Sequence, residues 1–197
     1  MRHKYPQIIL ACLMALFGTL SWAQNLPITT NLQIFTPFTT SGLSIGLAIT
    51  DRAQGSCFAS SAADPGRPDA WRCNVGNAIQ DPCFIDLAGK QLACAQEPFS
   101  ANALLLTLEG SLPERAPNRG FDAKAEPWAL ELANGQRCTP LTGATAPIAG
   151  MRINYGCDDD AYVAGPVDRS RPLWRVFYQN PDRSLSLQQV AVTTAWY

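Results

Sequence analysis

The stretch CFIDLAGKQLAC, residues 83–94, begins and ends with a cysteine and carries Ala88-Gly89 near its centre. A two-residue turn at Ala88-Gly89 would make it a β-hairpin in which Cys83 faces Cys94. Period-two alternation then puts one set of side chains on a single face: Cys83, Ile85, Leu87, Leu92 and Cys94. Opposed residues of an antiparallel pair lie about 4.5–5.5 Å apart at Cα, which a disulfide tolerates. The stretch therefore predicts a hairpin closed by a Cys83–Cys94 disulfide.

A second hairpin is predicted over WALELANGQRCTPL, residues 128–141. Its centre, Asn134-Gly135, is the strongest short signal for a hairpin turn, and it favours a type I′ turn with positive φ at both central residues. Alternation along the first strand puts Trp128, Leu130 and Leu132 on one face, which we expect to be buried.

The next predicted strand is MRINYGC, residues 151–157, which follows a loop at residues 142–150. It ends with Cys157, while Cys138 lies in the second strand of the preceding hairpin. A Cys138–Cys157 disulfide would tie these two strands together. By elimination, Cys57 pairs with Cys73 across a loop at residues 59–71 that is rich in Ser, Pro and Asp.

Elsewhere, short apolar runs between Pro and Gly turn signals predict further strands. They cover residues 43–50, 103–108, 173–179 and 185–196. A short helix fits residues 103–108 (ALLLTL) nearly as well as a strand. The sequence thus predicts a mainly β fold of antiparallel hairpins, arranged as a sandwich or as two small β lobes and stapled by three disulfides.

The stretch GSLPERAPNRG, residues 110–120, is short, polar and rich in proline, and it is the best candidate boundary. It predicts an N-terminal β lobe at residues 24–110 with four cysteines. A linker at 111–120 and a C-terminal β lobe at 121–197 with two cysteines would follow. The alternative is a single β sandwich crossed by a long loop.

Residues 1–23 have the order of a secretory signal peptide. Arg2 and Lys4 come first, an apolar run follows at residues 8–20, and Ser21-Trp22-Ala23 places small residues before a cut at Gln24. The run of thirteen residues would span about 20 Å as a helix, short of a bilayer core of about 30 Å. We therefore expect an exported chain, periplasmic or extracellular, rather than one anchored by this segment.

A lipoprotein signal ending at Cys12 is the other alternative, but it would leave an apolar region of only four residues. Read as part of the signal core, Cys12 is one of seven cysteines, so that six remain after cleavage: Cys57, Cys73, Cys83, Cys94, Cys138 and Cys157. An even number is what a disulfide framework requires. No two of them have the C-x-x-C spacing of a metal site. The chain left after cleavage is expected not to span a membrane.

Composition excludes several classes of function. The chain has 15 basic and 16 acidic residues, a net charge of −1, and no basic stripe, so we expect no nucleic-acid partner. Its one histidine, His3, lies in the signal segment. A mature chain without histidine cannot use a Ser-His-Asp or Cys-His mechanism. No P-loop or dinucleotide fingerprint occurs, and we expect no cofactor.

Five signatures resemble those of a family of exported bacterial proteins of unassigned function. They are GSCF at 55–58, DAWRC at 69–73, VGNAIQDPCF at 75–84, LANGQRCTPLTGATA at 132–146 and INYGC at 153–157. The resemblance covers most of the mature chain. It implies secretion and the same cysteine framework, and it supplies no catalytic residues.

Two groups of residues are candidates for binding. Asp158, Asp159 and Asp160 form an acidic run that is a weak candidate for Ca²⁺, although a solvated acidic turn is the better interpretation. Trp174, Tyr178 and Trp196 are candidate aromatics for stacking on a glycan or on a flat partner, with core packing as the alternative. No catalytic residue is assigned.

Three functions follow as hypotheses. The first is an exported, non-enzymatic domain that binds a cell-envelope or extracellular partner, either a glycan or a protein. The second is a carboxylate-dependent hydrolase acting on a glycan, which needs an acidic pair in a cleft with at least one raised pKa. The third is a purely structural secreted protein.

Overall fold

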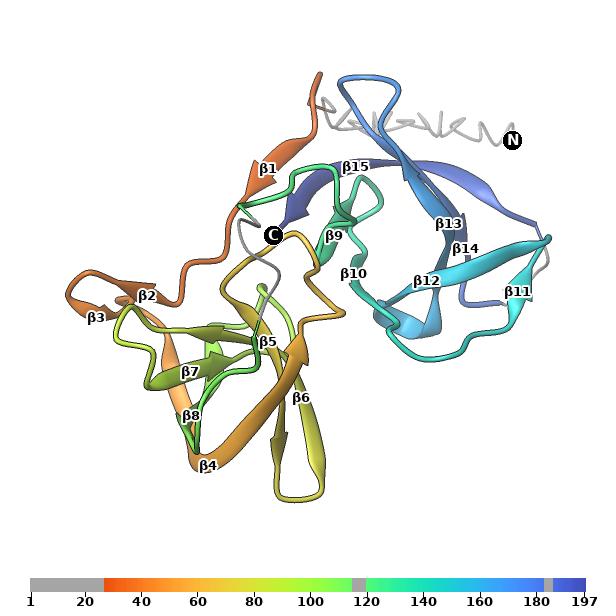
Figure 1. The fold of residues 1–197 in the computed structure, drawn as a ribbon. Coiled ribbons are helices and arrows are strands. Elements are labelled where there is room, and N and C mark those ends of the chain that lie inside the picture. Colours follow the sequence, from red (N-terminus) through yellow and green to blue (C-terminus); the bar gives the residue numbers. More distant parts are fainter. Residues whose placement is uncertain (1–26, 115–119, 183–185) are drawn as a thin grey trace, which may run out of the picture.

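The computed structural model describes residues 27–114, 120–182 and 186–197, so the expected signal at residues 1–23 lies outside the described residues. The described chain folds into two small barrel-like lobes, one at the lower left and one at the upper right of Figure 1. Both are built mainly from antiparallel strands, and three disulfides hold them. The predicted mainly β class is confirmed, as two lobes rather than a single sandwich. No helix in the described ranges is long and apolar enough to cross a membrane.

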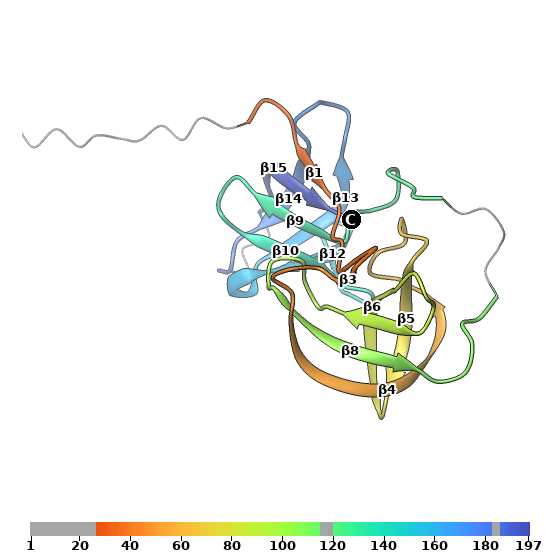
Figure 2. The same ribbon diagram turned by 90° about the vertical axis from the view of Figure 1, so that its left-hand side faces the viewer.

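The first barrel closes through five strands. These are β4 (Ala48–Ser60), β5 (Ala70–Val75), β6 (Ala78–Ile85), β7 (Gln91–Cys94) and β8 (Asn102–Leu108). The thirteen-residue β4 curves around the barrel in Figure 2 and pairs in parallel with β8, which closes it. Gly55 of β4 lies against β5, where an added Cβ would stand 2.1 Å from the carbonyl oxygen of Asn74. The short hairpin β2 (Phe38–Thr39) and β3 (Gly42–Leu43) precedes β4.

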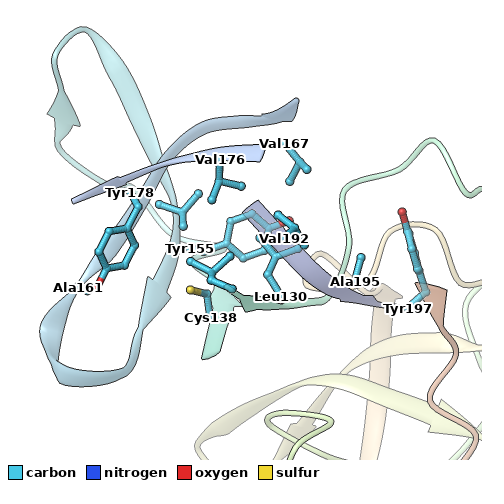
Figure 3. Close-up of a cluster of buried hydrophobic side chains, with 12 residues drawn as sticks. Leu130, Cys138, Tyr155, Ala161, Val167, Val176, Tyr178, Val192, Ala195 and Tyr197 are labelled. Carbon is cyan, nitrogen blue, oxygen red and sulfur yellow. The ribbon is translucent and has the colours of Figure 1, made fainter. Parts of the chain in front are cut away.

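The second barrel closes because β15 pairs with both β14 and β9. Its strands are β9 (Ala129–Leu132), β10 (Arg137–Pro140), β12 (Met151–Cys157), β13 (Tyr162–Asp168), β14 (Arg175–Gln179) and β15 (Gln188–Trp196). The two-residue β11 (Pro147–Ile148) pairs with β12. Figure 3 shows Leu130, Tyr155, Val176 and Val192 gathered between these strands, and all four are buried.

All three predicted disulfides are present: Cys57–Cys73, Cys83–Cys94 and Cys138–Cys157. Each joins two residues that face each other directly across an antiparallel pair of strands. Disulfides form and persist in oxidising compartments. The three bridges therefore agree with export.

The first hairpin has the predicted register, with Cys83 opposite Cys94 and Ile85 opposite Leu92, but its turn differs. The Gly89 N–H donates to the Asp86 carbonyl, and the Asp86 Oδ1 accepts from the backbone N–H groups of Lys90 and Gln91. The turn therefore begins at Asp86 and centres on Leu87 and Ala88. Leu87 was expected on the apolar face, but it lies at the tip of the turn and is 82% exposed.

The second hairpin is present without the predicted type I′ turn at Asn134-Gly135. The Leu132 N–H donates to the Gln136 carbonyl across a three-residue loop, and only Gly135 has positive φ, at 85°. Trp128, Leu130 and Leu132 are buried as predicted. The tight turn between β11 and β12, at Ala149-Gly150, has positive φ at both residues, as a type I′ turn requires.

The strand at residues 151–157 has the predicted bounds, and those at 103–108, 173–179 and 185–196 are confirmed with shifted ends, although residue 185 lies outside the described residues. The strand predicted at residues 43–50 is interrupted. There, the Leu47 N–H donates to the Ser44 carbonyl and Gly46 has a φ of 94°, so that a turn separates β3 from β4. The expected loop at residues 142–150 contains β11. Residues 103–108 lie in β8, which excludes the helical alternative.

The lobes do not divide at a single point of the chain. The strand β1 (Asn31–Gln33) precedes the first barrel in sequence but pairs in parallel with β15 of the second barrel, beside which it lies in Figure 1. The buried Oγ1 of Thr30 donates to the Val192 carbonyl and accepts from the Trp174 N–H. Within the expected linker at 111–120, residues 115–119 lie outside the described part of the chain.

Candidate functional site

A groove of about 440 Å³ opens on the first barrel and is lined mainly by polar side chains; we call it the polar groove. It is formed by β4, β6, β8 and the connection from β7 to β8. Its lining residues are Thr50, Asp51, Gln80, Cys94, Gln96, Glu97, Ser100, Asn102, Ala103 and Leu104.

A break in the β4–β8 register shapes one wall of the groove. Thr50 and Asp51 are neighbours in β4, whose side chains would normally point to opposite faces. The pairing with β8 shifts between Ile49 and Asp51, which is a bulge, and both Thr50 and Asp51 line the groove. Bulges commonly re-aim side chains in this way.

Most polar side chains of the groove have no hydrogen-bond partner among the described residues. Those of Gln80, Gln96, Glu97, Ser100 and Asn102 make no hydrogen bond to any other residue in the described ranges. Together they offer amide donors and acceptors, a hydroxyl and a carboxylate. Asp51 adds a second carboxylate, and no Lys or Arg of the described part of the chain lines the groove.

Asp64, which the sequence analysis did not single out, is a buried carboxyl at the boundary between the two barrels. It is 0% exposed, and neither of its carboxyl oxygens has a hydrogen-bond partner among the described residues. Burial raises its pKa to about 7, with a further rise from Asp69 and Asp81 and an opposing effect of Arg67. In the sequence, Asp64 begins a D-P-G turn signal, which gives no indication that it is buried.

The three candidate aromatics do not form one exposed platform. Tyr178 is 2% exposed and belongs to the core of the second barrel (Figure 3). Trp174 is half-buried beneath the guanidinium of Arg169, 4.8 Å from its ring. Trp196 is half-buried; its Nε1–H donates to Glu131 Oε1 at 2.8 Å, and its ring meets that of Phe99 edge-on.

Asp158–Asp160 form an exposed single turn of 3₁₀ helix between β12 and β13. The Oδ2 of Asp158 accepts a hydrogen bond from the Arg137 N–H, and Asp159 and Asp160 both have positive φ. In the part of the chain that the structure describes, no three Asp, Glu, Cys or His side chains lie together in a way that would hold a metal ion. The acidic run is a solvated turn.

Comparison of the chain with protein-family models, with curated proteins and with solved structures found no match in any of the three. The resemblance to a family of exported bacterial proteins therefore stays a prediction.

Proposed function

We propose that this chain is an exported, non-enzymatic domain that binds a cell-envelope or extracellular partner, and that the polar groove contacts a glycan on that partner. The observation that carries the proposal is the set of five polar side chains that line one groove without partners in the described chain. Glycan hydroxyls both donate and accept hydrogen bonds, and carboxylates and amides satisfy both capacities.

The charge of the groove narrows the class of glycan. Among the described residues, Asp51 and Glu97 are its only ionisable lining side chains, and both are acidic. An anionic sugar would be repelled, whereas a neutral sugar or an amino sugar with a free ammonium group would not. No aromatic ring of the described ranges lines the groove, so binding depends on hydrogen bonds rather than on stacking.

The first experiment incubates the oxidised protein, residues 24–197, with isolated cell-wall sacculi and analyses both pellet and supernatant. We expect protein in the pellet and no released glycan fragments. The double variant Gln96→Ala/Asn102→Ala should lose at least tenfold in affinity, because two hydrogen bonds of about 1 kcal/mol each are removed. The matched control is Gln189→Ala, an exposed glutamine of β15. Equal binding by the double variant and the control would rule out the groove as the binding site.

The hydrolase remains a second candidate because Asp51 and Glu97 line the same groove. Against it, Asp64, the carboxyl with the raised pKa of about 7, does not line the groove. Soluble fragments in the supernatant that disappear with Asp51→Asn or Glu97→Gln would favour hydrolysis over simple binding. If neither binding nor fragments are seen, the structural role is favoured.

A further inference from the structure

Residues 61–69, which connect β4 to β5, lie between the two barrels; we call them the junction loop. Ala63 packs in a buried cluster with Phe84 of the first barrel and with Trp128, which leads into the second. The Gly66 carbonyl accepts a hydrogen bond from the Asp122 N–H at 2.9 Å. A Cβ at Gly66 would stand 2.7 Å from the Asp122 carbonyl oxygen, so the two backbones are in close contact.

Arg67 is the main polar anchor of the junction loop. Its Nε and Nη2 donate to the two carboxylate oxygens of Asp69 at 2.8 and 2.6 Å. Its Nη1 donates to the carbonyls of Phe35, at 2.7 Å, and Tyr197, at 3.1 Å. The guanidinium also lies over the Phe84 ring, with Cζ 4.9 Å from the ring centre. One side chain thus joins the junction loop to the segment between β1 and β2 and to the residue that follows β15.

Asp64 lies inside this junction without a charged hydrogen-bond partner. Its backbone N–H donates to the Ser61 Oγ, which itself donates to Asp81 Oδ1. The charged or titratable groups that act on the Asp64 carboxyl come from three parts of the described chain: Arg67 and Asp69 of the loop, Asp81 of β6, and Tyr197 after β15. Asp81 is in turn 3.6 Å from the Arg72 guanidinium of β5. The hydrogen bonds of Arg67 go to Asp69 and to two carbonyls, none to Asp64.

We propose that the junction loop makes a proton-dependent contact between the two barrels. This contact holds the barrels together most strongly in acid and weakens as the pH approaches neutrality. A protonated Asp64 is uncharged and tolerates its burial. An ionised Asp64 would be a buried charge beside Asp69 and Asp81, which Arg67 and the Gly66 backbone N–H offset only in part. Opening of the junction would expose this charge to water.

The pH dependence has a defined shape. The Asp64 pKa is about 7 in the closed junction, while the ordinary value of 3.8 applies once the carboxyl is exposed. Between these values the closed state holds one more proton than the open state, so the opening constant rises about tenfold per pH unit. Above pH of about 8 both states are ionised and the constant levels off.

Amide hydrogen exchange of the oxidised chain, corrected for intrinsic exchange rates, tests the proposal between pH 5 and 8.5. The reporter is the Asp122 amide, and amides within β6 and β13 monitor the barrels themselves. We expect protection of Asp122 to fall about a hundredfold from pH 5 to pH 8 and then to stay level. Protection within the two strands should change far less.

Two variants separate the effect of Asp64 on the proton-dependent contact from general effects of pH. Asp64→Asn cannot ionise, so its Asp122 protection should be the same at pH 5 and pH 8. Glu109→Gln removes an exposed carboxylate and should keep the wild-type profile. A wild-type profile that is flat, or an Asp64→Asn profile that falls like wild type, would overturn the proposal. If Asp64→Asn does not fold, the wild-type profile decides alone.

Discussion

Arg67 makes its contacts with both barrels from a side chain that is 9% exposed. Arg67→Ala would remove hydrogen bonds to Asp69, Phe35 and Tyr197 together and leave the Asp69 carboxylate without its partner. We expect a loss of about 3 kcal/mol in the free energy of unfolding. Urea denaturation of the oxidised protein measures it. Arg67→Lys keeps the charge but not the bidentate geometry. Its free energy of unfolding should therefore lie between those of the wild type and of Arg67→Ala. A loss below about 1 kcal/mol for Arg67→Ala would contradict the assigned role.

Gly55 is required because there is no room for a side chain at this position, and not because of its backbone conformation. An added Cβ would lie 2.1 Å from the Asn74 carbonyl and 3.1 Å from the Leu106 side chain, so Gly55→Ala must push β4 away from β5. We expect a loss of about 2–3 kcal/mol, measured by thermal unfolding. Gly120→Ala is the matched control, because no atom of the described residues lies within 4 Å of its added Cβ. Similar melting temperatures for the two variants would show that β4 accommodates the methyl group.

At the scale of elements, Gly135 is required because of its left-handed backbone conformation, and not because a side chain would lack room. Its φ is 85° and nothing lies within 4 Å of an added Cβ. Gly135→Ala should cost about 1 kcal/mol, because an L-residue in the left-handed region is strained. Chemical denaturation checks this against Gly143→Ala, which has neither positive φ nor a neighbour within 4 Å. An unchanged midpoint for Gly135→Ala would mean that the loop relaxes to another turn.

The elements show which features can be predicted from sequence. Register in the first hairpin was predictable because alternation and the two cysteines both place Cys83 opposite Cys94. The turn was not, because Asp86 bonds two backbone N–H groups and begins the turn earlier. The type I′ turn predicted at Asn134-Gly135 was wrong for a related reason. The pairing of Leu132 with Gln136 leaves three residues in the loop, whereas a type I′ turn has two.

At the scale of the whole molecule, the lobe boundary was harder to predict because it depends on contacts between distant residues. The exposed groove residues and buried Asp64 likewise carry no motif, since partnerless side chains and burial appear only in three dimensions. Tyr178 illustrates the limit. Its sequence neighbours are compatible with a surface platform, and only the closure of the second barrel buries it.

The second barrel should not be stable as the separate fragment 121–197. It would lack β1 and the buried Thr30, whose hydroxyl bridges Val192 and Trp174. It would also expose Trp128, which packs against Phe35 and Phe84 in the whole chain. We expect the fragment to melt well below the intact protein, and a peptide of residues 27–36 to restore part of the difference. Circular dichroism during heating measures both. A fragment as stable as the whole chain would show that the second barrel folds independently.

The pairing of β1 with β15 has a consequence for how the chain is made. Asn31 of β1 pairs with Thr194 of β15, so β1 is synthesised early but stays without this partner until β15 has been synthesised. Because β15 also supplies partners to β9 and β14, a product that terminates before residue 188 leaves three strands with open edges at once. Open edges invite aggregation and proteolysis. Only a chain synthesised through β15 can therefore close the second barrel and cover these edges.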